Sequence, residues 1–269
     1  MDMMENFSVS LSSWLDIAIF TARQGGEVLK YYWGNLREIN EKTSPGDLVT
    51  EADKRSEEAI IAILAKNFPE HQILAEESGF HTKSSDFVWV IDPLDGTTNY
   101  THQYPMVAVS IGLLYQNQSI LGVIYNPITE ELFTAAKGLG AHLNGIPIHV
   151  SKVATLNKSL LATGFSYDRC IRTDNNYAEF CHLTNLTQGV RRGGAAALDL
   201  AYVACGRLDG YWELGIKTWD IAAGAIIVCE AGGQISDYNL GPVDFYSGRI
   251  LASNGHLQCL MSEKILCNV

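Results

Sequence analysis

Two aspartates, Asp92 and Asp95, lie in a short segment that could bind a metal ion and a phosphate. Residues 92–98 read Asp-Pro-Leu-Asp-Gly-Thr-Thr and follow the apolar run 87–91, so a buried strand would deliver these groups to one turn. Carboxylate oxygens, water and substrate phosphate are the ligands that Mg²⁺ prefers. Gly96 lets the backbone approach a ligand and donate its N–H. An ordinary Asp-rich β-turn explains the segment equally well, because Asp, Pro and Gly are common turn residues.

Three other segments carry acidic residues that could contribute to the same site. Glu76 and Glu77 end a short apolar strand, Asp220 opens an apolar helix, and Asp47 begins the run before another helix. Each has a plainer interpretation: a solvated loop for the glutamates, a helix N-cap for Asp220 and a turn residue for Asp47. All of them adjoin an apolar element rather than a polar loop, and this favours a shared site.

The elements that must position these acids follow from apolar periodicity. Spacing of three and four residues predicts an amphipathic helix over residues 11–32 and a second helix from about Asp53 to Asn67. Strand-like runs follow at 87–91, 106–115, 119–126 and 131–136. Because short turns join these runs, we expect a meander in which much of the sheet is antiparallel.

The chain beyond about residue 150 has a different order of elements. We expect strands at 159–163, 208–214 and 234–237, helices at 193–205 and 220–231, and a helix or loop over the polar residues 167–180. The pattern predicts a single domain of mixed α/β (α+β) structure, layered, with lobes of approximately 1–150 and 151–269. Periodicity does not determine whether the strands form one sheet or two.

The composition favours a globular protein that does not bind polyanions. The 269 residues are 47% hydrophobic and carry a formal net charge of −11. An acidic protein is a poor partner for nucleic acid or for an anionic membrane. A phosphorylated substrate would therefore need positive charge at the site, and bound metal ions could supply it.

The six cysteines are scattered and contain no CxxC pair, so the spacing of a zinc site is absent. We expect them to be buried thiols in a reducing compartment. The first residues lack the basic and apolar regions of a signal peptide, and no run of about 18 apolar residues suggests a membrane span. These features predict a cytoplasmic protein.

Four segments carry a resemblance to a known family. Residues 89–99 match WxxDPxDGTxN at every position, and residues 219–233 match WDxAAGxxxxxEAGG. Residues 47–53 match DLVTxAD, and residues 75–78 match GEES except that Ala75 replaces the glycine. The chain thus resembles the inositol monophosphatase family of Mg²⁺-dependent, lithium-sensitive phosphatases. The change at Ala75 adds a methyl group beside Glu76 but leaves the acid in place.

The resemblance implies a fold and a set of metal ligands. The fold is a layered αβαβα sandwich of the sugar-phosphatase type, commonly a homodimer, with two to three Mg²⁺ ions per site. The implied ligands are Glu76, Asp92, the Leu94 carbonyl and Thr97 for the first ion, Asp92, Asp95 and Asp220 for the second, and Glu76 and Asp47 near a third, weaker ion.

The implied reaction is hydrolysis of myo-inositol 1-phosphate by a metal-activated water, without a phosphoenzyme. Two divalent ions can stabilise the attacking and leaving oxygens of an in-line displacement. Glu76 and Thr97 would orient the water, and the resemblance also implies a catalytic role for Asp95. The N–H groups of Gly96 and Thr97 would hold the phosphate at a helix N-terminus. The remaining substrate contacts implied by the resemblance are Glu213, Asp220 and the backbone at Gly194, Ala195 and Ala196.

The substrate and the partners stay open on this information. The pair Arg191 and Arg192 could clamp a second phosphate or be a solvated or interface pair, and Lys217 could tune the site or face solvent. Related proteins on this fold act on fructose-1,6-bisphosphate, histidinol phosphate or nucleotide 3′-phosphates. A catalytically idle protein that binds other macromolecules is another alternative, and the intact set of acids argues against it.

Overall fold

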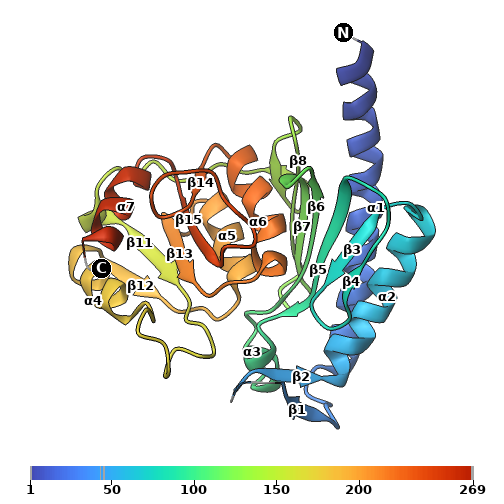
Figure 1. Cartoon of the computed structure of the whole chain (residues 1–269), viewed down its shortest axis with the longest axis horizontal. Coiled ribbons are helices and arrows are strands. Elements are labelled where there is room, and N and C mark those ends of the chain that lie inside the picture. The colour runs from blue at the N-terminus through green and yellow to red at the C-terminus, as the bar shows by residue number, and fades with distance from the viewer. Residues whose placement is uncertain (1, 43, 45, 268–269) are drawn as a thin grey trace.

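The computed structural model describes residues 2–42, 44 and 46–267, and its elements stack in alternating layers (Figure 1). Helices α1 (Asp2–Tyr32) and α2 (Glu51–Asn67) form one outer layer, and α4 (Tyr177–Leu186) and α7 (Gln258–Leu266) form the other. Between them lie an eight-stranded sheet, the helices α5 (Ala196–Ala204) and α6 (Thr218–Glu230), and a five-stranded sheet. The prediction of a layered αβαβα sandwich is confirmed.

The larger sheet has the strand order β10-β9-β8-β7-β6-β5-β3-β4. Its strands are β3 (Gln72–Ala75), β4 (Gly79–His81), β5 (Phe87–Asp95), β6 (Ala108–Tyr115), β7 (Gln118–Asn126), β8 (Glu131–Ala136), β9 (Ala141–Leu143) and β10 (Ile146–Pro147). From β5 to β10 the strands form the predicted antiparallel meander, while β3 pairs parallel with β5. A separate two-stranded sheet joins β1 (Ile39–Glu41) and β2 (Leu48–Thr50).

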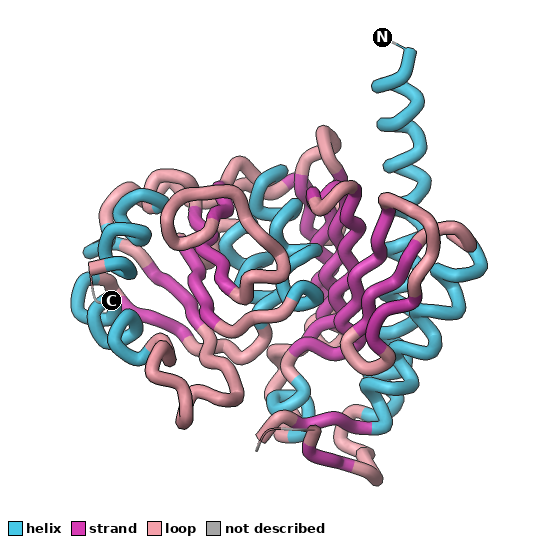
Figure 2. Tube along the Cα trace, viewed as in Figure 1, coloured by secondary structure: helices cyan, strands magenta, loops and turns pink. Residues whose placement is uncertain are grey.

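The smaller sheet has the strand order β12-β11-β13-β15-β14. Its strands are β11 (Leu160–Thr163), β12 (Gly189–Arg191), β13 (Gly210–Leu214), β14 (Gln234–Ser236) and β15 (Arg249–Ser253). Helices separate the two groups of strands in Figure 2. Both sheets are covered on both faces, so their strands are apolar runs. Such runs do not indicate which sheet a strand belongs to.

Helix α6 approaches the larger sheet closely at two glycines. A Cβ at Gly122 on β7 would lie 2.3 Å from the carbonyl oxygen of Ala223, and a Cβ at Gly112 on β6 would lie 2.8 Å from the Cβ of Ala222. Small residues on both surfaces allow this approach. The contact places the start of α6, which carries Asp220, beside the end of β5 and the start of β6.

Two helices begin earlier than periodicity predicts. Helix α1 begins at Asp2 rather than at residue 11, and α2 begins at Glu51. Thr50 caps α2, since its side chain accepts the N–H of Ala52 at 3.1 Å while Asp53 accepts the N–H of Thr50 at 2.8 Å. This reciprocal cap sets the start of the helix. The polar region 167–180 is a loop followed by the first residues of α4.

The prediction of buried cysteines was wrong. Five of the six cysteines are exposed and Cys205 is half-buried. Burial of cysteine is only an average tendency, and α4, α6 and α7 place Cys181, Cys229 and Cys259 at exposed positions. None of the described helices combines the length and the apolar character that crossing a membrane requires.

Candidate metal-dependent active site

The turn at residues 92–96 forms where β5 leaves its ladder. The pairing of β5 with β6 shifts in register between Asp92 and Asp95. Asp92 Oδ1 accepts the N–H of Leu94 at 2.9 Å, which holds the turn. Gly96 has φ of +89°, and a Cβ there would lie 2.8 Å from the carbonyl oxygen of Met106, so this position requires glycine. The turn therefore holds both aspartates in fixed places.

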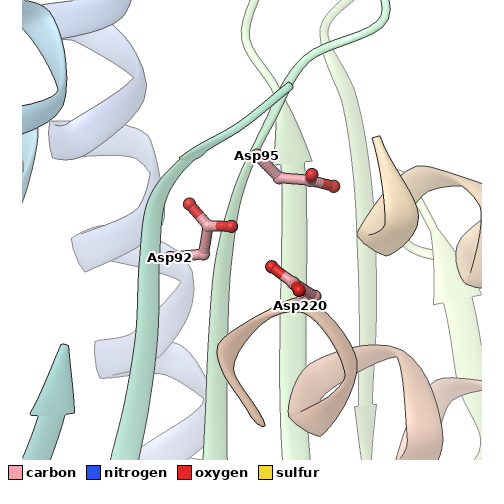
Figure 3. A group of neighbouring side chains, drawn as sticks. All are labelled: Asp92, Asp95 and Asp220. Carbon is pink, nitrogen blue, oxygen red and sulfur yellow. The ribbon is translucent and has the colours of Figure 1, made fainter. Parts of the chain in front are cut away.

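Asp220 joins the two aspartates of the turn from a distant part of the sequence. One carboxylate oxygen each of Asp92, Asp95 and Asp220 lies within 4.8 Å of the others, and Figure 3 shows the three side chains gathered at the end of β5 and the start of α6. Asp220 Oδ2 also accepts the N–H of Lys217 at 2.8 Å at the start of α6. Asp220 therefore accepts a hydrogen bond at the start of α6 and also belongs to the acidic cluster. Its interpretations as a helix cap and as a member of a shared acidic site are compatible.

Glu76 lies beside this cluster and is paired with a lysine. Burial, and then the nearby Glu76 carboxylate, raises the pKa of Asp92. Lys42 Nζ lies 2.7 Å from Glu76 Oε1 and 2.5 Å from Glu77 Oε1. The sequence does not predict that Lys42 pairs with these acids. No pattern around it could have shown that it reaches acids 34 and 35 residues further on.

The loop that carries Glu76 is held by a glutamate from α2. Glu57 is 3% exposed, and its two oxygens accept the N–H groups of Glu77 and Ser78, both at 2.8 Å. Two hydrogen bonds to one carboxylate fix the path of the backbone after β3. Nothing in the sequence predicts this role for Glu57, because its partners lie 20 and 21 residues further along the chain.

Thr97 is hydrogen-bonded to the helix cap of α2. Its Oγ1 lies 3.1 Å from Asp53 Oδ1 and 3.2 Å from the carbonyl oxygen of Leu94, and can donate to either. Asp53 is fully buried. The sequence places Asp53 only near the start of a helix, and the 44-residue separation from Thr97 hides the contact.

The carboxyl groups of this cluster repel one another when they are ionised. Burial, followed by the neighbouring carboxylates, raises the pKa of Asp92 and of Asp95 well above its usual range. Burial also raises the pKa of Glu76 to about 7 and that of Asp220 to about 7. An all-oxygen set of buried and half-buried carboxylates suits a hard divalent cation, whose charge would offset this repulsion. The residues present fit such an ion.

A cavity of about 930 Å³ opens above the cluster. The predicted site residues that line it are Asp47, Glu76, Asp92, Leu94, Asp95, Gly96, Thr97, Glu213 and Asp220, together with Lys217. Gly194, Ala195, Ala196, Arg191 and Arg192 are not among the described residues that line it. Gly194 and Ala195 instead pack behind Gly96, since a Cβ on Gly96 would lie 3.2 Å from Gly194 O and 3.3 Å from Ala195 Cβ.

Glu213 lies on the wall opposite the turn, at the end of β13. Its Oε2 accepts the hydroxyl of Tyr211, and Gly164 packs directly against its carboxylate. Burial raises the pKa of Glu213 to about 7, against the opposing effects of Tyr211 and Arg192. One side of this carboxylate is thus occupied by the protein, while the residue still faces the cavity.

An acid-floored cavity in a layered αβαβα fold is typical of metal-dependent phosphatases. A model of the inositol monophosphatase family matches residues 10–268, and the chain belongs to that family. It is 55% identical over 256 residues to the inositol-1-monophosphatase of Synechocystis, covering 95% of this chain and 89% of that protein. It is 45% identical over 247 residues to Nus factor SuhB of Pseudomonas aeruginosa, covering 89% of this chain and 91% of that protein.

Solved structures agree with this assignment. The structure of inositol monophosphatase from Anabaena (Nostoc) matches with a TM-score of 0.89 and 51% identity, over 97% of this chain and 98% of that one. The structure of inositol monophosphatase from Thermotoga maritima matches with a TM-score of 0.86 and 34% identity, over 94% and 97% of the two chains. The protein is a phosphatase of this family.

Proposed function

We propose that the protein is a Mg²⁺-dependent phosphomonoesterase that hydrolyses myo-inositol 1-phosphate to inositol and phosphate. The observation that carries this proposal is the meeting of Asp92, Asp95 and Asp220 at the floor of the cavity. These three acids come from two motifs more than a hundred residues apart in the chain, and no single local structure requires all of them to converge.

Two sets of residues would hold the metal ions. Asp92, Asp95 and Asp220 form one set, and Glu76, Asp92, the Leu94 carbonyl and Thr97 form the other, with Asp47 at the margin of the cavity for a weaker ion. When bound there, the ions would supply a more acidic water and positive charge for the phosphate and the leaving oxygen. Lys42, which pairs with Glu76, supplies one positive charge to the same acids.

The chain's own groups then position the reactants. Thr97 would relay one proton from the attacking water: its hydroxyl would take that proton while it passes its own to Asp53 Oδ1, to which it is hydrogen-bonded. Glu76 would accept a hydrogen bond from the other O–H of that water. The N–H groups of Gly96 and Thr97 would hold the phosphate, and Asp220 would hold a water for the leaving oxygen.

Glu213 would select the polyol. Its carboxylate faces the cavity and would accept hydrogen bonds from ring hydroxyls. A ligand without those hydroxyls would leave a buried acceptor without a partner, which is unfavourable. The backbone at Gly194, Ala195 and Ala196 would contribute only if that segment moves toward the substrate. The Synechocystis relative bears the name inositol-1-monophosphatase, and this supports the choice of substrate.

The experiment that tests the proposal is phosphate release from a panel of esters. The panel contains inositol 1-phosphate, fructose-1,6-bisphosphate, histidinol phosphate and a nucleotide 3′-phosphate, each with Mg²⁺. The highest kcat/KM is expected for inositol 1-phosphate. A higher value for another member would keep the chemistry and overturn the substrate.

A second candidate function is binding to a macromolecular partner. The relatives named Nus factor SuhB, at 45% identity, favour it. In a strain that lacks this protein, growth restored equally by wild type and by the Asp95→Asn variant would support a non-catalytic role. Restoration by wild type alone would contradict that role. We further propose that the protein is a cytoplasmic homodimer. Sedimentation of the purified chain would test the oligomeric state.

A further inference from the structure

Asn99 is the last residue of the motif at 89–99, and no step of the proposed reaction uses it. It lies on the short helix α3 (Thr97–Thr101), directly after the turn that carries Asp92 and Asp95. Its Nδ2 lies 2.8 Å from the carbonyl oxygen of Met106 and 2.9 Å from that of Gly193, so each of its two protons has its own acceptor. Gly193 is 94 residues further along the chain. The amide of Asn99 therefore joins the two halves of the chain.

The two segments that Asn99 joins are packed closely against each other and against α3. A Cβ at Gly193 would lie 2.3 Å from Met106 Cε. Gly194 has φ of +82°, and a Cβ there would lie 3.2 Å from Asn99 Nδ2. Glycine at both positions lets the backbone come this near. The contacts set the path of the chain just before α5 begins.

The first turn of α5 in turn contacts Asp95. Ala197, the second residue of that helix, donates its N–H to Asp95 Oδ2 at 2.7 Å. The first N–H groups of a helix have no partner within the helix, and its positive end favours a carboxylate. Ala197 is fully buried, so water does not compete for this bond. The orientation of the Asp95 carboxylate therefore depends on where α5 begins.

We propose that Asn99 is a positioning residue for metal binding. By anchoring Gly193 it sets the place of Ala197, whose N–H holds Asp95 Oδ2 and leaves Oδ1 for a divalent cation. The proposal deepens the proposed function and rests on it for a metal ion at Asp95. It also gives residues 193–197 a function that does not require them to touch the substrate.

The contact with Asp95 is tested by Ala197→Pro, which removes the N–H at a helix turn where proline is tolerated. Metal-free protein is titrated with Mn²⁺, an ion that also prefers oxygen ligands, and electron paramagnetic resonance measures the free ion. Loss of an outer partner should lower the affinity about 10–100-fold. The matched control is Ala178→Pro, at the exposed second position of α4, which should bind Mn²⁺ as wild type does.

The anchor itself is tested by Asn99→Leu, which removes both donors at similar size. Because Asn99 acts through Ala197, a smaller loss is expected, of at least about fivefold in Mn²⁺ affinity. The matched control is Asn254→Leu. Asn254 Nδ2 also has two distant acceptors, Val153 O at 2.7 Å and Ser151 Oγ at 2.8 Å, and it is not among the described residues that line the cavity. This control should lose stability but keep its Mn²⁺ affinity.

The double variant Asn99→Leu/Ala197→Pro shows whether the two residues act on one contact. It should lose no more affinity than Ala197→Pro alone, since residues in one network are not additive. Unchanged Mn²⁺ affinity in Asn99→Leu, or losses that add in the double variant, would overturn the proposal. If Ala197→Pro does not fold, the comparison of Asn99→Leu with Asn254→Leu decides. Wild type that binds no metal ion is a separate result, which contradicts the proposed function and this inference together.

Discussion

Thr97 Oγ1 and Asp53 Oδ1 are hydrogen-bonded at 3.1 Å, and this contact links the cap of α2 to the turn of β5. Asp53 has two roles here, because its other oxygen, Oδ2, accepts the N–H of Thr50 at 2.8 Å at the start of the helix. A residue that looks like a helix cap in the sequence therefore orients a hydroxyl on the floor of the cavity.

Asp53→Asn should slow catalysis more than it destabilises the fold. Its amide can still accept one hydrogen bond, but it is a weaker acceptor and should not promote proton transfer through Thr97. We expect kcat to fall about 10²–10⁴-fold, with a loss of about 0.5–2 kcal/mol of stability from the weakened cap. Steady-state kinetics and thermal unfolding separate the two effects. A kcat within threefold of wild type would remove Asp53 from the mechanism.

Glu57→Gln should weaken metal binding without changing the chemistry at saturating metal. An amide accepts through one oxygen only, so either Glu77 N–H or Ser78 N–H loses its partner and the loop of Glu76 loosens. Loss of such an outer partner typically lowers metal affinity about 10–100-fold. The expected result is a raised half-saturating Mg²⁺ concentration with kcat nearly restored at high Mg²⁺.

The control for this variant is the adjacent Glu58→Gln, an exposed residue whose ion pair among the described residues is with Arg55. It should behave as wild type in the Mg²⁺ titration. If Glu57→Gln lowers kcat at saturating Mg²⁺ and leaves the half-saturating concentration unchanged, the positioning role assigned to Glu57 is wrong.

Glu213→Gln should discriminate between substrates. A charged acceptor for ring hydroxyls is worth about 1.5–3 kcal/mol, so kcat/KM for inositol 1-phosphate is expected to fall about 10–100-fold. A phenyl phosphate has no hydroxyls for this residue to contact, and its kcat/KM should change little. Parallel kinetics on the two esters provide the measurement, and equal losses on both would show that Glu213 does not contact the polyol.

The buried carboxyl group of Asp199 should make the stability of the fold depend on pH. This residue of α5 is 2% exposed, and its Oδ1 has no hydrogen-bond partner among the described residues. Burial, and then Glu213, raises the pKa of Asp199 well above its usual range. The folded state therefore binds more protons here than the unfolded state, and stability falls as the pH rises above about 4.

Asp199→Asn removes this ionisation while keeping the shape of the protonated acid. The melting temperature of the variant should equal that of wild type near pH 4 and exceed it by at least about 2–4 °C at pH 8. Both proteins are measured in EDTA, with the exposed Asp16→Asn as the control that shows no such trend. A melting temperature below wild type at pH 8 would show that the ionised carboxylate stabilises the fold.

The sequence was informative where the governing interactions are local. Apolar periodicity located β6, β7 and β8 within two residues, and the motifs identified Asp92, Asp95 and Asp220, which the structure brings within 4.8 Å. Lys42, Asp53 and Glu57 were missed because each acts on a residue 20 to 44 positions away, a relationship that only the folded backbone creates. The division into two sheets was undetermined for the same reason.

The central claim is that Asp95 helps to hold a metal ion on which phosphate release depends. The most direct measurement is phosphate release from inositol 1-phosphate by wild type and Asp95→Asn, each in Mg²⁺ and in EDTA. Wild type should be active only with Mg²⁺, and the variant should lose at least about a hundredfold in kcat/KM with its fold intact, since even outer partners of metal ligands matter to this degree. Equal activity in EDTA, or a fully active Asp95→Asn variant, would contradict the account.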